Sequence, residues 1–111
     1  MPDKTERLHI FATIKPKSEF FSDAKGALEK LVPLTLEEPG CHLFKVLENR
    51  DEQGVLHLFE IFEDEDAVQA HYEKDYTKQV FARYQSWLAE PVVAKHLSVT
   101  SPLSSDQFYD N

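Results

Sequence analysis

The segment from Cys41 to Glu63 limits the possible folds more than any other part of the chain. It holds two runs, "CHLFKVLEN" and "VLHLFEIFE", which are joined by the short polar stretch "RDEQG". Strand-like runs separated by a polar loop that ends in glycine predict an antiparallel hairpin. Large apolar side chains occupy both sides of each run, whereas a sheet with one wet face carries them on one side only. The sequence therefore predicts a sheet that is covered on both faces.

The elements predicted around this hairpin define the fold class. Apolar spacing predicts strands at residues 7–14 and 92–100, and helices at about 18–38, 64–72 and 76–91. The order is β-α-β-β-α-β with a split second helix, which is the ferredoxin-like α+β arrangement. Its helices cover only one face of a four-stranded sheet. A second copy of the chain is the expected partner, because a homodimer with the two sheets back to back would cover the other face.

Local signals set the expected helix boundaries. Ser18 and Asp64 are the types of residue that cap helix N-termini, so each should begin a helix. Glu38 precedes Pro39, and a residue before proline is disfavoured in the helical conformation, so the first helix should end there. Pro39 and Gly40 then suit the central positions of a type II turn, because glycine accepts a positive φ.

Bulk properties exclude several classes of partner. The 111 residues fit one domain, expected at residues 1–103 and followed by a polar C-terminal tail at 104–111. The formal charge of -8 would repel a phosphate backbone, so nucleic acid is not an expected partner. The charged start "MPDKTERLHI" and the lone cysteine favour a cytoplasmic protein. No apolar run reaches the roughly 18 residues of a membrane helix, so a membrane is not expected either.

Four sequence features, taken in order, carry a family resemblance. They are "EEPGC" after the first helix, "FEIF" in the third strand, "DEDAVQAH" ending in His71, and Phe81. With these features the chain resembles the antibiotic biosynthesis monooxygenase (ABM) domain family, a dimeric α+β barrel, from about Leu8 to Pro102. The resemblance implies a cofactor-independent monooxygenase that oxidises a quinol or polycyclic phenol with O₂.

The same superfamily leaves two other functions open. The stretch "FEIFEDEDAVQAHYEKDYTK" is also similar to the isomerases that process the phosphorylated autoinducer-2 signal. Such an isomerase would need cationic groups at its pocket mouth, for which Lys45, Lys74, Lys78 and Arg83 are available. The third possibility is a dimer that binds a small ligand without catalysis, because fold alone does not fix function.

The chain also departs from the family pattern after His71. The family motif usually continues there with a proline, a histidine and an aromatic residue, whereas this chain has Asp75, Tyr76 and Thr77. Relatives that degrade haem carry a tryptophan at the position of His71 and an iron-ligating histidine at the position of Phe81. Haem is therefore not expected, and neither is any other cofactor.

Glu60 and His71 are the predicted catalytic residues. Glu60 alternates with Leu58 and Phe62 along an apolar strand, so it should share their inward face. Burial there would raise its pKa and make it a proton acceptor near neutral pH. The spacing of His71 from Val68 turns it toward the sheet, and a histidine can take and return a proton. The competing interpretations are a carboxylate satisfied by a hydrogen bond and a histidine bonded to the end of its own helix.

Apolar and aromatic residues are predicted to bind a planar substrate. The predicted substrate-binding residues are Leu58, Phe62, Tyr72, Phe81 and Tyr84. Trp87 has helical spacing with the last two of these, but core packing is the favoured interpretation for it. Tyr76 lies with Tyr72 at the helix break, where both are expected either to gate a pocket mouth or to lie on the surface.

The remaining histidines and the cysteine do not suggest further chemistry. No short metal-ligand spacing links the histidines outside the second helix, so a metal site is not expected. The three glycines are scattered and form no phosphate loop. Cys41 has no visible base beside it except His42, so a small buried apolar side chain is the favoured interpretation.

Overall fold

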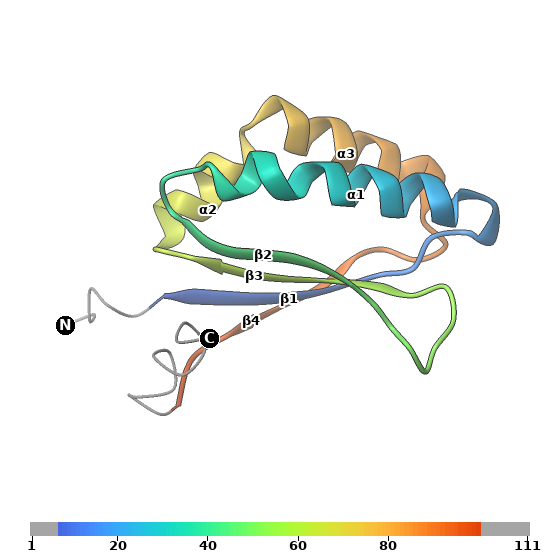
Figure 1. Cartoon of the computed structure of the whole chain (residues 1–111), viewed down its shortest axis with the longest axis horizontal. Coiled ribbons are helices and arrows are strands. Elements are labelled where there is room, and N and C mark those ends of the chain that lie inside the picture. Colours follow the sequence, from blue (N-terminus) through green and yellow to red (C-terminus); the bar gives the residue numbers. More distant parts are fainter. Residues whose placement is uncertain (1–6, 101–111) are drawn as a thin grey trace.

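A computed structural model describes residues 7–100 and shows three helices packed on one face of a four-stranded antiparallel sheet (Figure 1). In chain order the elements are β1 (Leu8–Ile14), a 3-10 turn (Ser18–Phe20), α1 (Phe21–Leu36), β2 (Cys41–Glu48), β3 (Leu56–Phe62), α2 (Glu65–Tyr72), α3 (Asp75–Trp87) and β4 (Val93–Leu97). The strand order is β2-β3-β1-β4, so β1 lies between β3 and β4. The predicted ferredoxin-like fold and the β2–β3 hairpin are confirmed.

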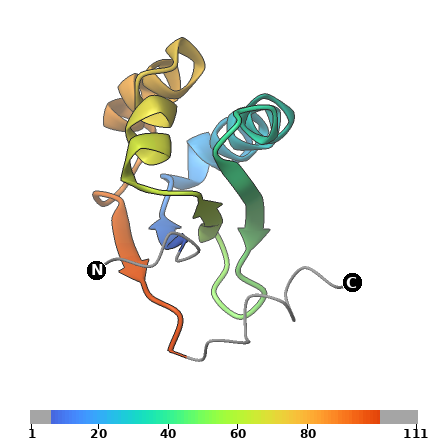
Figure 2. The same cartoon turned by 90° about the vertical axis from the view of Figure 1, so that its left-hand side faces the viewer.

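The helix layer leaves the opposite face of the sheet without helices in the described part of the chain. Figure 2 shows α1 beside the α2–α3 pair, with the sheet below both. No helix between residues 7 and 100 is long and apolar enough to cross a membrane. The predicted domain end at residue 103 and the predicted tail at 104–111 lie outside the described residues.

Two expected helix boundaries, the start of α1 and the end of α3, are wrong. Ser18 opens a 3-10 turn and makes no side-chain cap to α1, which begins at Phe21. The last helix ends at Trp87 instead of Pro91, because the next backbone groups bond to the segment after β1. The Ala89 N–H donates to the Lys15 carbonyl at 2.8 Å, and the Lys17 N–H donates to the Trp87 carbonyl at 2.8 Å. Asp64, in contrast, does cap α2, since its Oδ1 accepts a hydrogen bond from the Ala67 N–H at 2.9 Å.

The turn between α1 and β2 differs from the predicted type II turn. The Cys41 N–H donates to the Glu38 carbonyl at 3.0 Å, which closes a four-residue turn. Among the described residues only Gly54 has a positive φ, so Gly40 does not adopt the type II conformation. Gly40 is needed for space instead, because a Cβ at this position would lie 2.4 Å from the Ala67 Cβ on α2. This close approach fixes the turn against α2.

The core lies between the helices and the inner face of the sheet. Its main cluster joins β1, β2 and β3 to α1 and α3, and consists of Ala12, Ile14, Leu28, Leu31, Phe44, Leu56, Leu58 and Val80. A second cluster joins Ile10 of β1 and Phe62 of β3 to Val68 of α2. Alternation along β1 and β3 sends every second side chain into these clusters, which explains why both strands carry apolar residues at that period.

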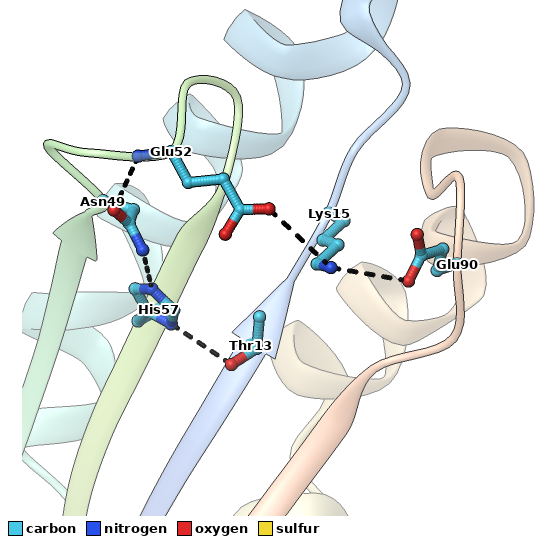
Figure 3. A network of polar contacts seen from close by, with 6 residues as sticks. All are labelled: Thr13, Lys15, Asn49, Glu52, His57 and Glu90. Atoms are coloured by element: carbon cyan, nitrogen blue, oxygen red, sulfur yellow. Dashed lines mark hydrogen bonds and ion pairs between the residues drawn. The ribbon is translucent and has the colours of Figure 1, made fainter.

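The outer face of the sheet carries a polar network next to the β2–β3 hairpin loop (Figure 3). Asn49 Oδ1 accepts hydrogen bonds from the N–H groups of Asp51 and Glu52, both at 2.9 Å, and so organises the hairpin loop. The Asn49 amide nitrogen must then donate to His57 Nε2 at 3.1 Å, which leaves Nδ1–H to donate to Thr13 Oγ1 at 3.2 Å. The network therefore ties the hairpin loop to β1 across β3.

Candidate functional site

An apolar cavity of about 60 Å³ lies between the inner face of the sheet and the helices. Its lining is Ile10, Ala12, Ile14, Leu31, Phe44, Leu58, Glu60, His71, Tyr72, Thr77, Phe81, Tyr84, Val92 and Ala94. Both predicted catalytic residues line this cavity, together with four of the five predicted substrate-binding residues. Ligand sites commonly measure roughly 300–1,000 Å³, so a substrate would have to displace some of these side chains.

Glu60 is a buried carboxyl group on β3. It lies opposite Ile10 of β1 and Phe44 of β2, and only 6% of its surface is exposed. Its carboxyl group makes no hydrogen bond with any residue between 7 and 100. Burial, followed by the nearby charge of Glu38, raises its pKa from 4.5 to about 7. The carboxyl group thus changes its protonation state close to neutral pH.

His71 enters the cavity from the last turn of α2 and is 3% exposed. Its Nδ1 lies 3.0 Å from Glu38 Oε2, and a carboxylate only accepts hydrogen bonds, so Nδ1 carries the proton and donates. The other ring nitrogen, Nε2, makes no hydrogen bond to a described residue. The ring centroids of Phe44 and Phe62 lie 5.6 and 5.2 Å from the centroid of the imidazole ring. The two rings therefore surround the imidazole with apolar surface.

Glu38 is the site residue that the sequence analysis missed. It is only 8% exposed, although it follows the end of α1 and precedes the turn. Its Oε2 accepts hydrogen bonds from both His71 Nδ1 and the Tyr76 hydroxyl. A glutamate before proline indicates the end of a helix, and this signal does not reveal that the side chain is buried. The available signal was its place in "EEPGC", where the turn at Pro39 and Gly40 directs it toward α2.

Tyr76 and Phe62 have positions that the sequence did not predict. Tyr76 does not line the cavity, because its hydroxyl is hydrogen-bonded to Glu38 and also lies 3.4 Å from the Leu34 carbonyl. Phe62 is fully buried behind His71 instead of lining the cavity. Trp87 is 9% exposed and lies outside the cavity with Arg83 over its ring, as the core interpretation predicts.

The cavity wall toward α3 is aromatic. The ring of Phe81 lies 5.8 Å from that of Tyr72 and 5.6 Å from that of Tyr84, so the three rings form one continuous wall. Burial and the charge of Glu60 raise the pKa of Tyr84, so its hydroxyl stays protonated. Phe81 is 44% exposed and therefore stands between the cavity and solvent. Displacement of its side chain would widen the cavity toward solvent.

The other reactive groups do not form a second site. Burial, followed by the charge of Glu38, raises the pKa of the Cys41 thiol to about 11, which disfavours the nucleophilic thiolate. Between residues 7 and 100 no group of three or more His, Cys, Asp or Glu side chains is placed to hold a metal ion. The chemistry of the described residues is thus concentrated on the acid–base groups of the cavity.

The ferredoxin-like sheet with helices on one face places the chain among small α+β proteins, and its acid–base groups lie on the wall of an apolar cavity. Residues 7–83 match the model of the family described as antibiotic biosynthesis monooxygenase, and the chain belongs to this family. No functionally curated protein sequence matches the chain.

Solved structures share the fold at low sequence identity. The structure of Rv0793 from Mycobacterium tuberculosis has a TM-score of 0.81 at 23% identity, covering 86% of this chain and 96% of that one. A putative antibiotic biosynthesis monooxygenase from Nitrosomonas europaea has a TM-score of 0.82 at 19% identity, with 92% and 98% covered. A similarly described protein from Caulobacter crescentus has a TM-score of 0.79 at 22% identity, with 87% and 92% covered.

Proposed function

We propose that the protein is a cofactor-independent monooxygenase that oxidises a quinol or polycyclic phenol with O₂. The observation that carries this proposal is the pairing of two proton-transfer groups, Glu60 and His71, on the wall of one apolar, aromatic cavity. Membership of the ABM family supports the same reaction class. The substrate would bind between Leu58 and the rings of Tyr72, Phe81 and Tyr84.

In this mechanism the protein moves protons while the substrate supplies the electrons. His71 accepts the phenolic proton at Nε2, and the resulting electron-rich anion transfers one electron to O₂. The two radicals combine to a carbon-bound peroxide anion, which takes the proton back from His71. Nε2 then removes the proton from the peroxide-bearing carbon while the O–O bond breaks, which leaves a new carbonyl group and releases the outer oxygen as water. Glu60, with its pKa of about 7, is protonated often enough near neutral pH to give the leaving oxygen its proton. For an anthrone-type substrate one CH₂ group and O₂ become one C=O group and H₂O, so no other reductant is needed.

The apolar wall has a second task in this scheme. An anion and a peroxide must be kept from bulk water until they have reacted, and the mainly apolar lining of the cavity disfavours water beside them. The substrate itself is larger than the cavity, so its entry requires the displacement of Phe81. The partly exposed position of this side chain supports that route.

We also propose that the protein works in the cytoplasm as a homodimer with the sheets back to back. The outer face carries Leu47, Val93 and Leu97, whose exposed fractions are 40%, 54% and 45%. The Phe11 and His57 rings stack on the same face with centroids 4.9 Å apart. Apolar surface of this kind on one face favours contact with a second copy.

The cations considered for an isomerase do not favour that alternative. Lys45, Lys74, Lys78 and Arg83 are absent from the residues that line the cavity. Lys45 points to the outer face of the sheet, since it is the register partner of Phe59, and Arg83 lies over Trp87. Among residues 7–100, a phosphorylated substrate would therefore find no cation on the cavity wall beside the acid–base groups.

Oxygen consumption tests the proposed reaction directly. The wild type should take up O₂ with anthrone-like phenols or menadiol-like quinols, and His71→Ala should lose this uptake by a factor on the order of 10²–10⁴. His96→Ala is the matched control, because His96 is an exposed histidine outside the cavity. A wild type that consumes no O₂ with either substrate class would contradict the proposal and favour a ligand-binding module.

A further inference from the structure

Hydrogen bonds from two helices meet at one carboxylate oxygen of the α1–β2 turn. Glu38 Oε2, from the α1–β2 turn, accepts hydrogen bonds from His71 on α2 and from Tyr76 on α3. Glu38 and His71 are 33 residues apart in sequence, and both are buried. A buried charge costs much free energy unless hydrogen bonds compensate it. Such an arrangement therefore calls for an explanation beyond the ending of a helix.

We infer that Glu38 is a positioning residue that holds His71 in the Nδ1–H tautomer and directs the bare Nε2 to the substrate. This inference rests on the proposed function for the part that concerns turnover. Glu38 itself does not line the cavity, so it acts through His71. A carboxylate that orients a histidine in this way leaves the opposite ring nitrogen free to act as a base.

The turn around Glu38 explains how its carboxylate is kept in place. The Cys41 N–H donates to the Glu38 carbonyl, and the Glu63 N–H donates to the Gly40 carbonyl at 2.7 Å. Gly40 also lies directly against Ala67 of α2, the helix that carries His71. Carboxylate and imidazole are thus mounted on two segments in direct backbone contact, which keeps their separation short.

Tyr76 adds a second constraint from the other side. Its hydroxyl donates to the same Oε2 atom, so the carboxylate cannot rotate without breaking two hydrogen bonds. Burial and hydrogen bonding to Glu38 raise the pKa of Tyr76, which keeps the hydroxyl protonated as a donor. The carboxylate also lies next to the positive charge that forms when Nε2 takes a proton. Glu38 is therefore placed to stabilise that charge as well as the tautomer.

The tautomer can be measured without any substrate. In protein with ¹⁵N-labelled histidine, long-range ¹H–¹⁵N correlations at about pH 9, where imidazoles are mostly neutral, distinguish a protonated nitrogen from a bare one. The His71 signals are those that disappear in His71→Ala. We expect wild-type His71 with Nδ1 protonated and Nε2 bare, and a mixed or reversed tautomer in Glu38→Gln. Glu37→Gln, which changes the neighbouring exposed glutamate, should leave the wild-type pattern.

Turnover provides the second measurement. With a substrate that the wild type oxidises, Glu38→Gln should lower kcat by a factor on the order of 10²–10⁴ with little change in KM, because the tautomer is wrong while the cavity is intact. Glu38→Asp should recover part of the loss if the shorter carboxylate still reaches Nδ1, and Glu37→Gln should lose none.

The outcomes separate this inference from the proposed function. Wild-type His71 in the Nε2–H tautomer would overturn the positioning role even if Glu38→Gln failed to fold. A tautomer unchanged by both Glu38→Gln, which keeps one acceptor oxygen, and Glu38→Leu, which removes both, would overturn it as well. A tautomer that switches in Glu38→Gln, in a protein that oxidises no substrate, would support the positioning role and reject only the monooxygenase reaction.

Discussion

At the scale of single residues, Glu60 is the group whose environment most affects both stability and chemistry. It is a carboxyl group with 6% exposure and no hydrogen-bond donor among residues 7–100. Such a group is stable when protonated and costly when ionised. The pKa of about 7 therefore couples the protonation of the site to the folding of the whole domain.

This coupling predicts that the protein loses stability as the pH rises. Below about pH 4 the Glu60 carboxyl is protonated in both the folded and the unfolded chain, and its contribution is fully present. As the pH rises from 4.5 through about 7, the unfolded chain releases the proton first and the folded state loses that contribution. A pKa shift of this size corresponds to about 3 kcal/mol. Urea unfolding at a series of pH values should show this loss in the wild type and a smaller one in Glu60→Gln.

A matched variant isolates the effect of burial from that of the acidic surface. Glu63→Gln changes a carboxylate whose side chain is 45% exposed and which is paired with His42. Its pH profile should follow the wild type on the alkaline side. Parallel profiles for the wild type and Glu60→Gln would show that Glu60 is not the buried acid described here.

The residue scale also shows what sequence periodicity can and cannot locate. The inward positions of Glu60 and His71 follow from alternation along a strand and from helical spacing, and the structure places both in the cavity. Glu38 could not be found in this way, because its burial depends on a turn that docks on α2. Phe62 has the same strand period as Glu60, but it packs behind His71, and periodicity does not distinguish a cavity wall from the core.

At the scale of elements, the contact between the α1–β2 turn and α2 sets the geometry of the site. A Cβ added at Gly40 would lie 2.4 Å from the Ala67 Cβ, so one of the two segments would have to move. Overpacking of this kind typically costs roughly 1–3 kcal/mol. Gly40→Ala should therefore unfold at lower urea concentration, and the His71 tautomer should become less defined because Glu38 moves with the turn.

Two further variants test whether the contact with α2 causes this loss of stability. Gly26 is the matched control, since a Cβ there meets nothing within 4 Å, and Gly26→Ala should stabilise α1 by about 1 kcal/mol. Ala67→Gly removes the atom that Gly40→Ala would contact, so the double variant should recover part of the lost stability. Equal urea midpoints for Gly40→Ala and the wild type would mean that the turn is not held against α2.

Element boundaries were predictable where local chemistry decides them. The Asp64 cap of α2 is confirmed because the cap uses only neighbouring residues. The start of α1, the end of α3 and the turn at Gly40 were predicted wrongly, because tertiary contacts decide them. The backbone after Trp87 pairs with residues 15–17, and this pairing ends α3. The turn at Gly40 packs against Ala67 of α2, a contact that residues near the turn do not predict.

At the scale of the whole molecule, the outer sheet face predicts the state of assembly. Leu47 on β2 is an apolar side chain with 40% exposure on the face opposite the helices. Burial of such side chains against a second copy would favour a dimer by about 25 cal/mol per Å² of apolar surface removed from water. A lysine on the face that forms the proposed contact would lose hydration without gaining a partner. Leu47→Lys should therefore weaken the dimer, which sedimentation equilibrium can measure as an increase in the dissociation constant.

A control on the helical side separates assembly from general surface effects. Leu36, at the end of α1, is 47% exposed, and Leu36→Lys makes the same chemical change away from the sheet. It should leave the dissociation constant unchanged, and both variants should keep the urea midpoint of their monomeric state close to that of the wild type. If both variants or neither weakened self-association, the back-to-back arrangement would be wrong. The apolar residues of the outer face would then either contact a different partner or stay exposed to solvent.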